Sequence, residues 1–223
     1  LLLVICSFLY KGYKDQKMTK RRPAVSVNQI PHAFRAYRPK IVIFMGRLLL
    51  KIFGWRVEGA VPEMSENENL VLIAAPHTSN WDGIFGFAAI IGLDAKISYF
   101  GKYTLFNQPI LGRFLKYMGG IPVDKNNPGS GLVKEAIANM EKLKGSLIAM
   151  APEGTKSKTE QWRTGFLRIA EAVDARIFVA AFDFNTKRIV LDKFFKPSED
   201  MQKDLDNLKA YYTQYGAKKP ENF

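Results

Sequence analysis

The sequence predicts an α/β protein with a central, mostly parallel sheet flanked by helices, preceded by an N-terminal amphipathic helical segment that docks on a membrane. Compact apolar runs at 70–75 and 146–151 are short and bulky enough to be buried strands, and each ends at a proline. Helical patterns alternate with such strands, which is typical of a parallel sheet covered on both faces. A basic, apolar stretch before residue 58 predicts the docking segment.

The strand at 70–75 leads directly into a helix. Pro76 stops the strand, and Ser79 or Asn80 is a suitable N-cap for a helix that continues to Ile90. The rest of the pattern predicts, in order, a strand at 96–100, an amphipathic piece at 105–117, an apolar stretch ending in charges at 119–125, a helix at 131–144, the strand at 146–151, a helix at 165–173, strands at 177–184 and 188–191, and a polar helix at 198–215.

Composition and charge divide the chain. Its 223 residues, 47% of them hydrophobic, suffice for one ordinary domain with a sizeable core. Residues 11–57 hold twelve basic residues and one acidic residue, so they carry almost all of the net charge of +12. We expect three regions: an apolar, then basic segment at 1–29 that is partly disordered or not native, a basic amphipathic helical segment at 30–57 that associates with membranes, and a catalytic domain at 58–223.

The first ten residues are apolar but too few to span a bilayer, which takes roughly 20. Two interpretations stay open for them: the end of a truncated transmembrane segment or signal, or upstream codons before a start at Met18. The single cysteine, Cys6, excludes an internal disulfide and favours a reducing compartment.

The stretch 41–57 is apolar around a thin basic stripe. Arg47 and Lys51 are four residues apart and share one helical face. One interpretation is a buried helix on the domain core. The other is a helix in a membrane interface, with its cations towards the phosphate headgroups. The clustered charge and the rim residue Trp55 favour the second, in which Phe53 also takes part in membrane association.

His77 and Asp82 form the first candidate site. His77 lies in the turn after the strand at 70–75, and Asp82 lies in the first turn of the helix that follows. Reactive groups collect at this end of the strands in open α/β sheets. A histidine with one nitrogen held by a carboxylate presents the other as a base, which suits activation of a hydroxyl. An ordinary polar contact is the alternative for such a pair taken alone.

Charged groups also follow three other apolar stretches. Pro152 and Gly154, on either side of a glutamate, indicate a backbone shaped for a close approach. Taken singly, residues 152–156 are a plain turn, and Lys102 and Lys125 are solvated surface amines. The groups are Lys102, the pair Asp124 and Lys125, and Glu153 with Thr155 and Lys156.

Taken together, these pieces resemble the glycerophosphate and lysophosphatidate acyltransferases, the 1-acyl-sn-glycerol-3-phosphate O-acyltransferase family. The resemblance covers residues 57–191, with three blocks in the family's order and spacing. The blocks are similar to His77-Thr78-Ser79-Asn80-Trp81-Asp82, to Gly120-Ile121-Pro122-Val123-Asp124-Lys125, and to Pro152-Glu153-Gly154-Thr155-Lys156. The implied fold is that of a glycerolipid acyltransferase.

Three departures bear on the acceptor more than on the chemistry. Pro76 stands where the family usually has Asn before the histidine. Lys125 stands where the second block usually ends in Arg, which keeps the charge but loses a bidentate fork for phosphate. The fourth block, normally an apolar run with a proline, is matched by 177–182 without a proline, so only a structural role is expected there.

The resemblance implies transfer of a fatty acyl group from a thioester, acyl-CoA or acyl-carrier protein, to a hydroxyl of a lysophosphatidate-like glycerolipid. It makes His77 the general base and Asp82 its orienting carboxylate, without a covalent acyl-enzyme. Another lysophospholipid or lyso-lipid acceptor is the alternative. The implied acceptor contacts are Lys102, Lys125 and Lys156 for the phosphate, and Glu153, Gly154 and Thr155 for the rest of the molecule.

The expected partners are a phospholipid membrane surface, a lyso-glycerolipid acceptor and a thioester donor. The domain is expected at the cytoplasmic face of a membrane, peripheral or monotopic. We expect no cofactor beyond the thioester co-substrate and no metal, because the sequence offers no convincing ligand cluster. A basic nucleic-acid-binding protein would explain the charge before residue 58 but would leave the three motifs unused. A catalytically silent lipid-binding relative would lack His77 or Asp82, and both are present.

Overall fold

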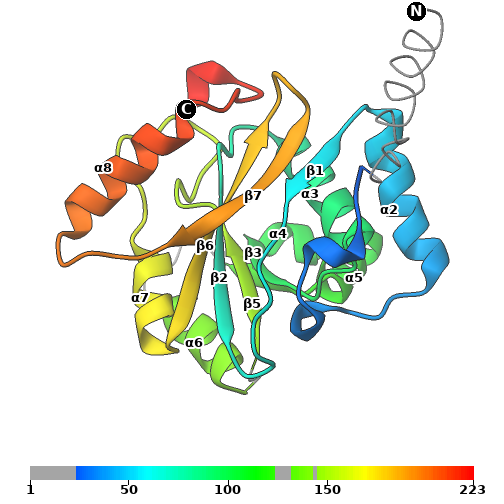
Figure 1. The fold of residues 1–223 in the computed structure, drawn as a ribbon, viewed down its shortest axis with the longest axis horizontal. Helices are drawn as coiled ribbons and strands as arrows, with labels where there is room; N and C mark the ends of the chain where they lie inside the picture. The colour runs from blue at the N-terminus through cyan, green and yellow to red at the C-terminus, as the bar shows by residue number, and fades with distance from the viewer. Residues whose placement is uncertain (1–23, 124–131, 143–144) are drawn as a thin grey trace, which may run out of the picture.

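The computed structural model describes residues 24–123, 132–142 and 145–223, so the predictions for 1–23 and for Asp124 and Lys125 lie outside the described residues. A seven-stranded sheet forms the central layer, with helices on both of its faces (Figure 1). The strands are β1 (Arg56–Gly59), β2 (Asn69–Ala75), β3 (Ser98–Lys102), β4 (Gly120–Val123), β5 (Leu147–Met150), β6 (Ala175–Asp183) and β7 (Arg188–Phe195). The helices are α2 (Lys40–Ile52), α3 (Asn80–Gly92), α4 (Tyr103–Phe106), α5 (Pro109–Tyr117), α6 (Leu132–Lys142), α7 (Gly165–Ala172) and α8 (Met201–Tyr212), with short 3-10 turns η1 (Val27–Gln29), η2 (His32–Phe34) and η3 (Pro220–Asn222).

The strand order is β1-β7-β6-β2-β5-β3-β4. Strand β2 lies between β6 and β5 and is parallel to both, and β3 continues the parallel set between β5 and β4. Strand β7 pairs antiparallel with β6, and β1 runs parallel to β7 at the edge. The prediction of a mostly parallel sheet is confirmed. The carboxyl ends of β2, β5 and β3 therefore meet at one edge of the sheet.

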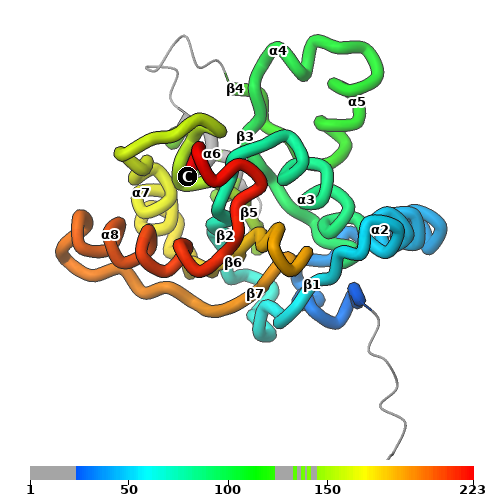
Figure 2. The backbone as a smooth tube through the Cα atoms, turned by 90° about the horizontal axis from the view of Figure 1, so that it is seen from above, coloured from blue at the N-terminus to red at the C-terminus, as the bar shows by residue number. Residues whose placement is uncertain are grey.

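Both faces of the sheet are buried, which explains why β2 is apolar along its length. Leu70 and Leu72 point into the core on one face, where Phe85 of α3 also lies. Val71 and Ile73 point into the core on the other face, together with Phe166 of α7. Seen from above, α7 and α8 lie on one side of the sheet, and α2 and α3 lie on the other (Figure 2).

Helix α2 packs against α3 on one side and is exposed on the other. Gly46 and Leu50 are buried towards α3, whereas Ile41, Met45 and Ile52 are exposed apolar side chains. No helix in the three described ranges combines the length and the apolar character needed to cross a membrane.

Two side chains predicted to face a membrane face the protein instead. The assignment of Trp55 is wrong: its side chain is only 3% exposed, and its ring stacks on Phe85 with the ring centroids 4.3 Å apart. Arg47 is half-buried, and its Nε donates to the carbonyl oxygen of Gly92 at the end of α3 (2.9 Å), where a cation also complements the helix dipole. Lys51 and Phe53 remain exposed.

Candidate active site

The loop between β2 and α3 holds His77 against Asp82. Ser79 is the N-cap of α3, and Asp82, in the first turn of the helix, completes the capping box. Nδ1 of His77 lies 3.2 Å from Oδ2 of Asp82; the Asp82 side chain is fully buried, and that of His77 is 30% exposed. Since Nδ1 faces the carboxylate, Nε2 is the imidazole nitrogen left to act on a substrate.

Asp82 is held by the backbone of the loop that it orients. Its Oδ2 accepts hydrogen bonds from the N–H groups of Thr78 and Ser79, both at 2.7 Å, and its Oδ1 accepts one from the Ser79 hydroxyl at 2.9 Å. These donors compensate the buried charge, as burial of a carboxylate requires. The carboxylate is therefore fixed in place before any substrate binds.

Glu153 approaches the same loop from the end of β5. Its Oε1 accepts a hydrogen bond from the backbone N–H of His77 (2.8 Å), although the two residues are 76 positions apart in the sequence. Its Oε2 is buried and has no hydrogen-bond partner within the part of the chain that the structure describes. Burial raises the pKa of the Glu153 carboxyl to about 7, while the N–H and the imidazole of His77 act in the opposite direction. Glu153 thus positions His77 and keeps one oxygen unused.

The turn after Glu153 brings one predicted cation to the start of α3. Gly154 has φ +65°, a left-handed conformation that favours glycine, and its N–H donates to Ala151 within the turn (3.0 Å). The Lys156 ammonium donates to the side-chain oxygen of Asn80, the first residue of α3. The Thr155 hydroxyl accepts from the N–H of Ser157 at 3.2 Å. Lys156 therefore lies beside the His77 loop.

Of the other two predicted cations, the structure describes only Lys102. Lys102 is the last residue of β3, is exposed, and lies at the same edge of the sheet as the His77 loop. Lys125 lies outside the described residues. Arg163, which sequence reasoning missed, packs over Gly154: a side-chain carbon at Gly154 would stand 2.9 Å from Arg163 Cγ, and the Arg163 N–H donates to Pro152 (2.7 Å). No spacing in the sequence indicates that contact.

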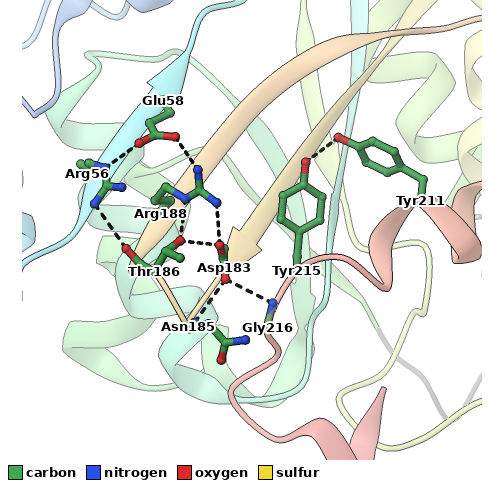
Figure 3. Close-up of polar contacts among 9 residues, drawn as sticks. All are labelled: Arg56, Glu58, Asp183, Asn185, Thr186, Arg188, Tyr211, Tyr215 and Gly216. Atoms are coloured by element: carbon green, nitrogen blue, oxygen red, sulfur yellow. Dashed lines mark hydrogen bonds and ion pairs between the residues drawn. The ribbon is translucent and has the colours of Figure 1, made fainter.

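Residues 216–223 pack on the His77 loop, a contact that the motifs did not predict. The N–H of Lys219 donates to the buried Thr78 hydroxyl (3.1 Å). The segment is anchored at its start by Asp183, whose Oδ1 accepts from the N–H of Gly216 (3.2 Å). Figure 3 shows the network behind that anchor, in which Arg188 bridges Asp183 (2.9 Å) and Glu58 (2.8 Å). Burial raises the pKa of Asp183, but the hydrogen bonds from Thr186 and Arg188 more than offset this and leave it below its usual value.

Among the described residues, no group of three or more His, Cys, Asp and Glu side chains could hold a metal ion. The arrangement is suited to proton transfer instead. It joins a partly exposed imidazole, a fully hydrogen-bonded buried carboxylate behind it, a second buried carboxylate with a spare oxygen, and an ammonium group beside them.

Known proteins give an independent comparison. The chain is 28% identical over 118 residues to a protein named 1-acyl-sn-glycerol-3-phosphate acyltransferase from Streptococcus pneumoniae (strain ATCC BAA-255 / R6), a match that covers 53% of this chain and 43% of that protein. It is 30% identical over 112 residues to a protein of the same name from Bacillus subtilis (strain 168), covering 50% of this chain and 54% of that protein. The chain thus spans about half the length of these relatives.

The fold is also similar to a solved one. The crystal structure of the 1-acyl-sn-glycerophosphate (LPA) acyltransferase PlsC from Thermotoga maritima superposes with a TM-score of 0.51 and 18% identity, covering 78% of this chain and 76% of that one. At this level of identity the likeness concerns the fold. A family model described as Acyltransferase matches residues 56–182, a range that includes β1, the His77 loop and the Glu153 turn. This match covers more than half of the chain, and the chain belongs to the acyltransferase family.

Proposed function

We propose that this protein is an O-acyltransferase that moves a fatty acyl group from a thioester to a hydroxyl of a lysophosphatidate-like glycerolipid. The observation that carries the proposal is the placement of His77 Nδ1 3.2 Å from the fully buried carboxylate of Asp82, with the imidazole still partly exposed. The names of the two bacterial relatives support the choice of acceptor.

In this reaction His77 acts as the general base. Nε2 accepts the proton of the acceptor hydroxyl while that oxygen forms a bond to the thioester carbonyl carbon. The carbon–sulfur bond then breaks, and the departing thiolate takes the proton from the imidazolium, which returns His77 to its neutral form. Asp82 holds the tautomer and stabilises the transient positive charge. Assistance of this kind contributes about 10²–10⁴-fold to a rate.

Cations beside the base would hold the acceptor phosphate. Lys156 contacts Asn80 at the start of α3, beside the loop, and Lys102 and Lys125 complete the proposed set. The spare oxygen of Glu153 can accept a hydrogen bond from a second hydroxyl of the acceptor. Gly154 and Thr155 form the turn between Glu153 and Lys156. The donor is acyl-CoA or an acyl-carrier-protein thioester.

The reaction would take place at a membrane, because both the acceptor and the product are lipids. The exposed side of α2, with Lys51 and Phe53, is the proposed contact with phospholipid, and the domain is then peripheral at the cytoplasmic face.

The test is an acceptor panel assayed with one labelled acyl-CoA and read by product mass. The expected product is that of lysophosphatidate, and a different preferred lyso-lipid would change the acceptor while keeping the reaction. His77→Ala should lose nearly all turnover, about 10²-fold or more. The matched control is His32→Ala, since His32 is the other histidine of the chain and is exposed on η2. If both variants keep wild-type turnover, His77 is not the base.

A further inference from the structure

Helix α5 carries its apolar row on the outside. Ile110, Phe114 and Tyr117 follow one another at i, i+4 and i+7, so they share one face, and all three are exposed, Ile110 by 86% and Tyr117 by 65%. A helix on the surface of a domain ordinarily turns such a row towards the core. The outward row on α5 therefore needs a partner that the described chain does not supply.

The opposite face of α5 is already in close contact with the domain. Gly112 and Leu115 are buried, and a side-chain carbon at Gly112 would stand 2.1 Å from the carbonyl oxygen of Phe106 in α4. The absence of a side chain at Gly112 lets the two segments approach at backbone distance. Turning Ile110 inward would separate α4 from α5. The outward orientation of the row therefore follows from the packing of these two helices.

The charged residues of the segment that carries the row are all of one sign. Between residues 96 and 123 the sequence holds no Asp or Glu, and it holds four basic residues, of which Arg113 and Lys116 are exposed on α5 itself. An apolar row flanked by cations is complementary to a surface that has negatively charged groups above an apolar layer. Anionic phospholipid at a bilayer surface has both properties.

A shallow groove beside the row is also apolar. It measures about 550 Å³ and is lined by Gln108, Pro109, Ile110, Leu111 and Phe114. Exposed apolar concavities of this kind mark contacts with other molecules, since water gains little there.

The row on α5 continues an apolar band that begins on α2. Phe114 lies next to Phe87 of α3, with ring centroids 5.8 Å apart. At the start of α3, Trp81 and Ile84 are exposed, and the Trp81 ring lies 6.1 Å from that of Phe53, just after α2. Figure 2 shows α2, α3 and α5 following one another along this part of the molecule. The band thus passes the first turn of α3, directly beside the His77 loop.

We propose that α5 is a second bilayer-docking element, which inserts Ile110, Phe114 and Tyr117 at the headgroup boundary of an anionic phospholipid surface while Arg113 and Lys116 contact phosphate. A single contact through α2 would leave the domain free to rotate about that helix. A second contact across the His77 loop fixes the orientation, so that the site faces the lipid. Exposed aromatic side chains such as Trp81 and Tyr117 are suited to that boundary.

The experiment compares two double variants of the full chain in vesicle co-sedimentation. Ile110→Glu/Tyr117→Glu places two charges on the row, and Met201→Glu/Asn207→Glu places the same two charges on exposed positions of α8, across the sheet. With phosphatidylcholine vesicles that contain about one third phosphatidylglycerol, the α5 variant should bind about tenfold more weakly or worse, and the α8 variant should bind like the wild type. Thermal unfolding of both should match the wild type, because all four positions are exposed.

A comparison of anionic vesicles with pure phosphatidylcholine vesicles tests the role of the two cations. Arg113→Gln/Lys116→Gln should lose affinity for the anionic vesicles and keep the weaker affinity for pure phosphatidylcholine. Turnover is not read in either experiment, so the result is independent of the acyl-transfer proposal. The α5 proposal is overturned if the wild type does not bind vesicles, if the α5 and α8 variants lose affinity equally, or if α5 supports a vesicle-free complex with an acidic carrier protein instead.

Discussion

Asp82 and Glu153 are two buried carboxylates that hold the same histidine loop in different ways. Asp82 accepts three hydrogen bonds and lies beside the imidazole, so both of its oxygens are used. Glu153 accepts one hydrogen bond, from the N–H of His77, and its other oxygen has no partner among the described residues. Both are almost completely removed from water.

The two sites differ in how far hydrogen-bond donors compensate the burial of a carboxylate. Donors compensate Asp82, whereas burial dominates at Glu153 and raises its pKa to about 7. A fully used carboxylate is a fixed orienting group. A carboxylate with a spare oxygen and a pKa near neutrality can still gain a hydrogen bond from a ligand, and it can exchange its proton under physiological conditions. The two roles are therefore separable by substitution.

Among substitutions that separate the two carboxylates, the largest effect is expected for Asp82→Asn. Oδ2 of Asp82 both accepts from the loop N–H groups and faces His77 Nδ1, so an amide that keeps its oxygen there loses the negative charge that stabilises the imidazolium. An amide turned the other way presents a donor to Nδ1, so the imidazole is no longer held in the tautomer that leaves Nε2 basic. We expect turnover to fall about 10²–10⁴-fold with a smaller change in KM, measured with saturating thioester.

Circular dichroism and thermal unfolding serve as the control for this variant, since Asp82 also caps α3. A folded Asp82→Asn protein with turnover within a fewfold of the wild type would contradict the orienting role.

The second effect concerns the pH dependence of stability. In the unfolded chain Glu153 ionises near the ordinary value of 4.5, but in the folded protein it keeps its proton until about pH 7. The folded state thus binds more protons between these values, so the free energy of unfolding falls as the pH rises from 4.5 through 7. Glu153→Gln cannot ionise, so the wild type should lose about 3 kcal/mol relative to this variant over that range.

Urea unfolding of both proteins at pH 5 and pH 8 measures this difference, and all other titrating groups cancel in the comparison. A difference that stays constant between the two pH values would mean that Glu153 is ionised throughout, and that burial does not raise its pKa in the folded protein.

Local sequence signals predicted the elements that carry the site. The runs that became β2 and β5 are recognisable because strands buried on both faces must be apolar without alternation. Ser79 and Asn80 are both recognisable as candidate caps, and the structure selects Ser79, whose hydroxyl accepts from the N–H of Trp81 while the Asp82 carboxylate accepts from the N–H of Ser79 itself. The proximity of His77 to Asp82 follows from these two local facts.

Contacts between distant segments could not be read in this way. Trp55 has the same character at a membrane rim and in a core, and only the packing of Phe85 against it decides between them. Similarly, nothing in the sequence around Glu153 indicates that it accepts from the His77 backbone, because that contact depends on β5 lying next to β2. The contact of 216–223 with Thr78 depends in the same way on tertiary structure.

The smallest effect is expected for Thr78→Val. This variant tests how much the contact with residues 216–223 contributes to the position of the His77 loop. Valine keeps the shape of the buried side chain and removes the acceptor for the Lys219 N–H, while the backbone N–H of residue 78 still donates to Asp82. A single neutral hydrogen bond is worth about 0.5–1.5 kcal/mol, so turnover should fall by no more than about tenfold, with KM nearly unchanged. Thr78→Ser restores the hydroxyl and should restore turnover, a rescue that a packing role would not give. A loss as large as that of Asp82→Asn would show that residues 216–223, rather than the buried carboxylate, fix the position of His77.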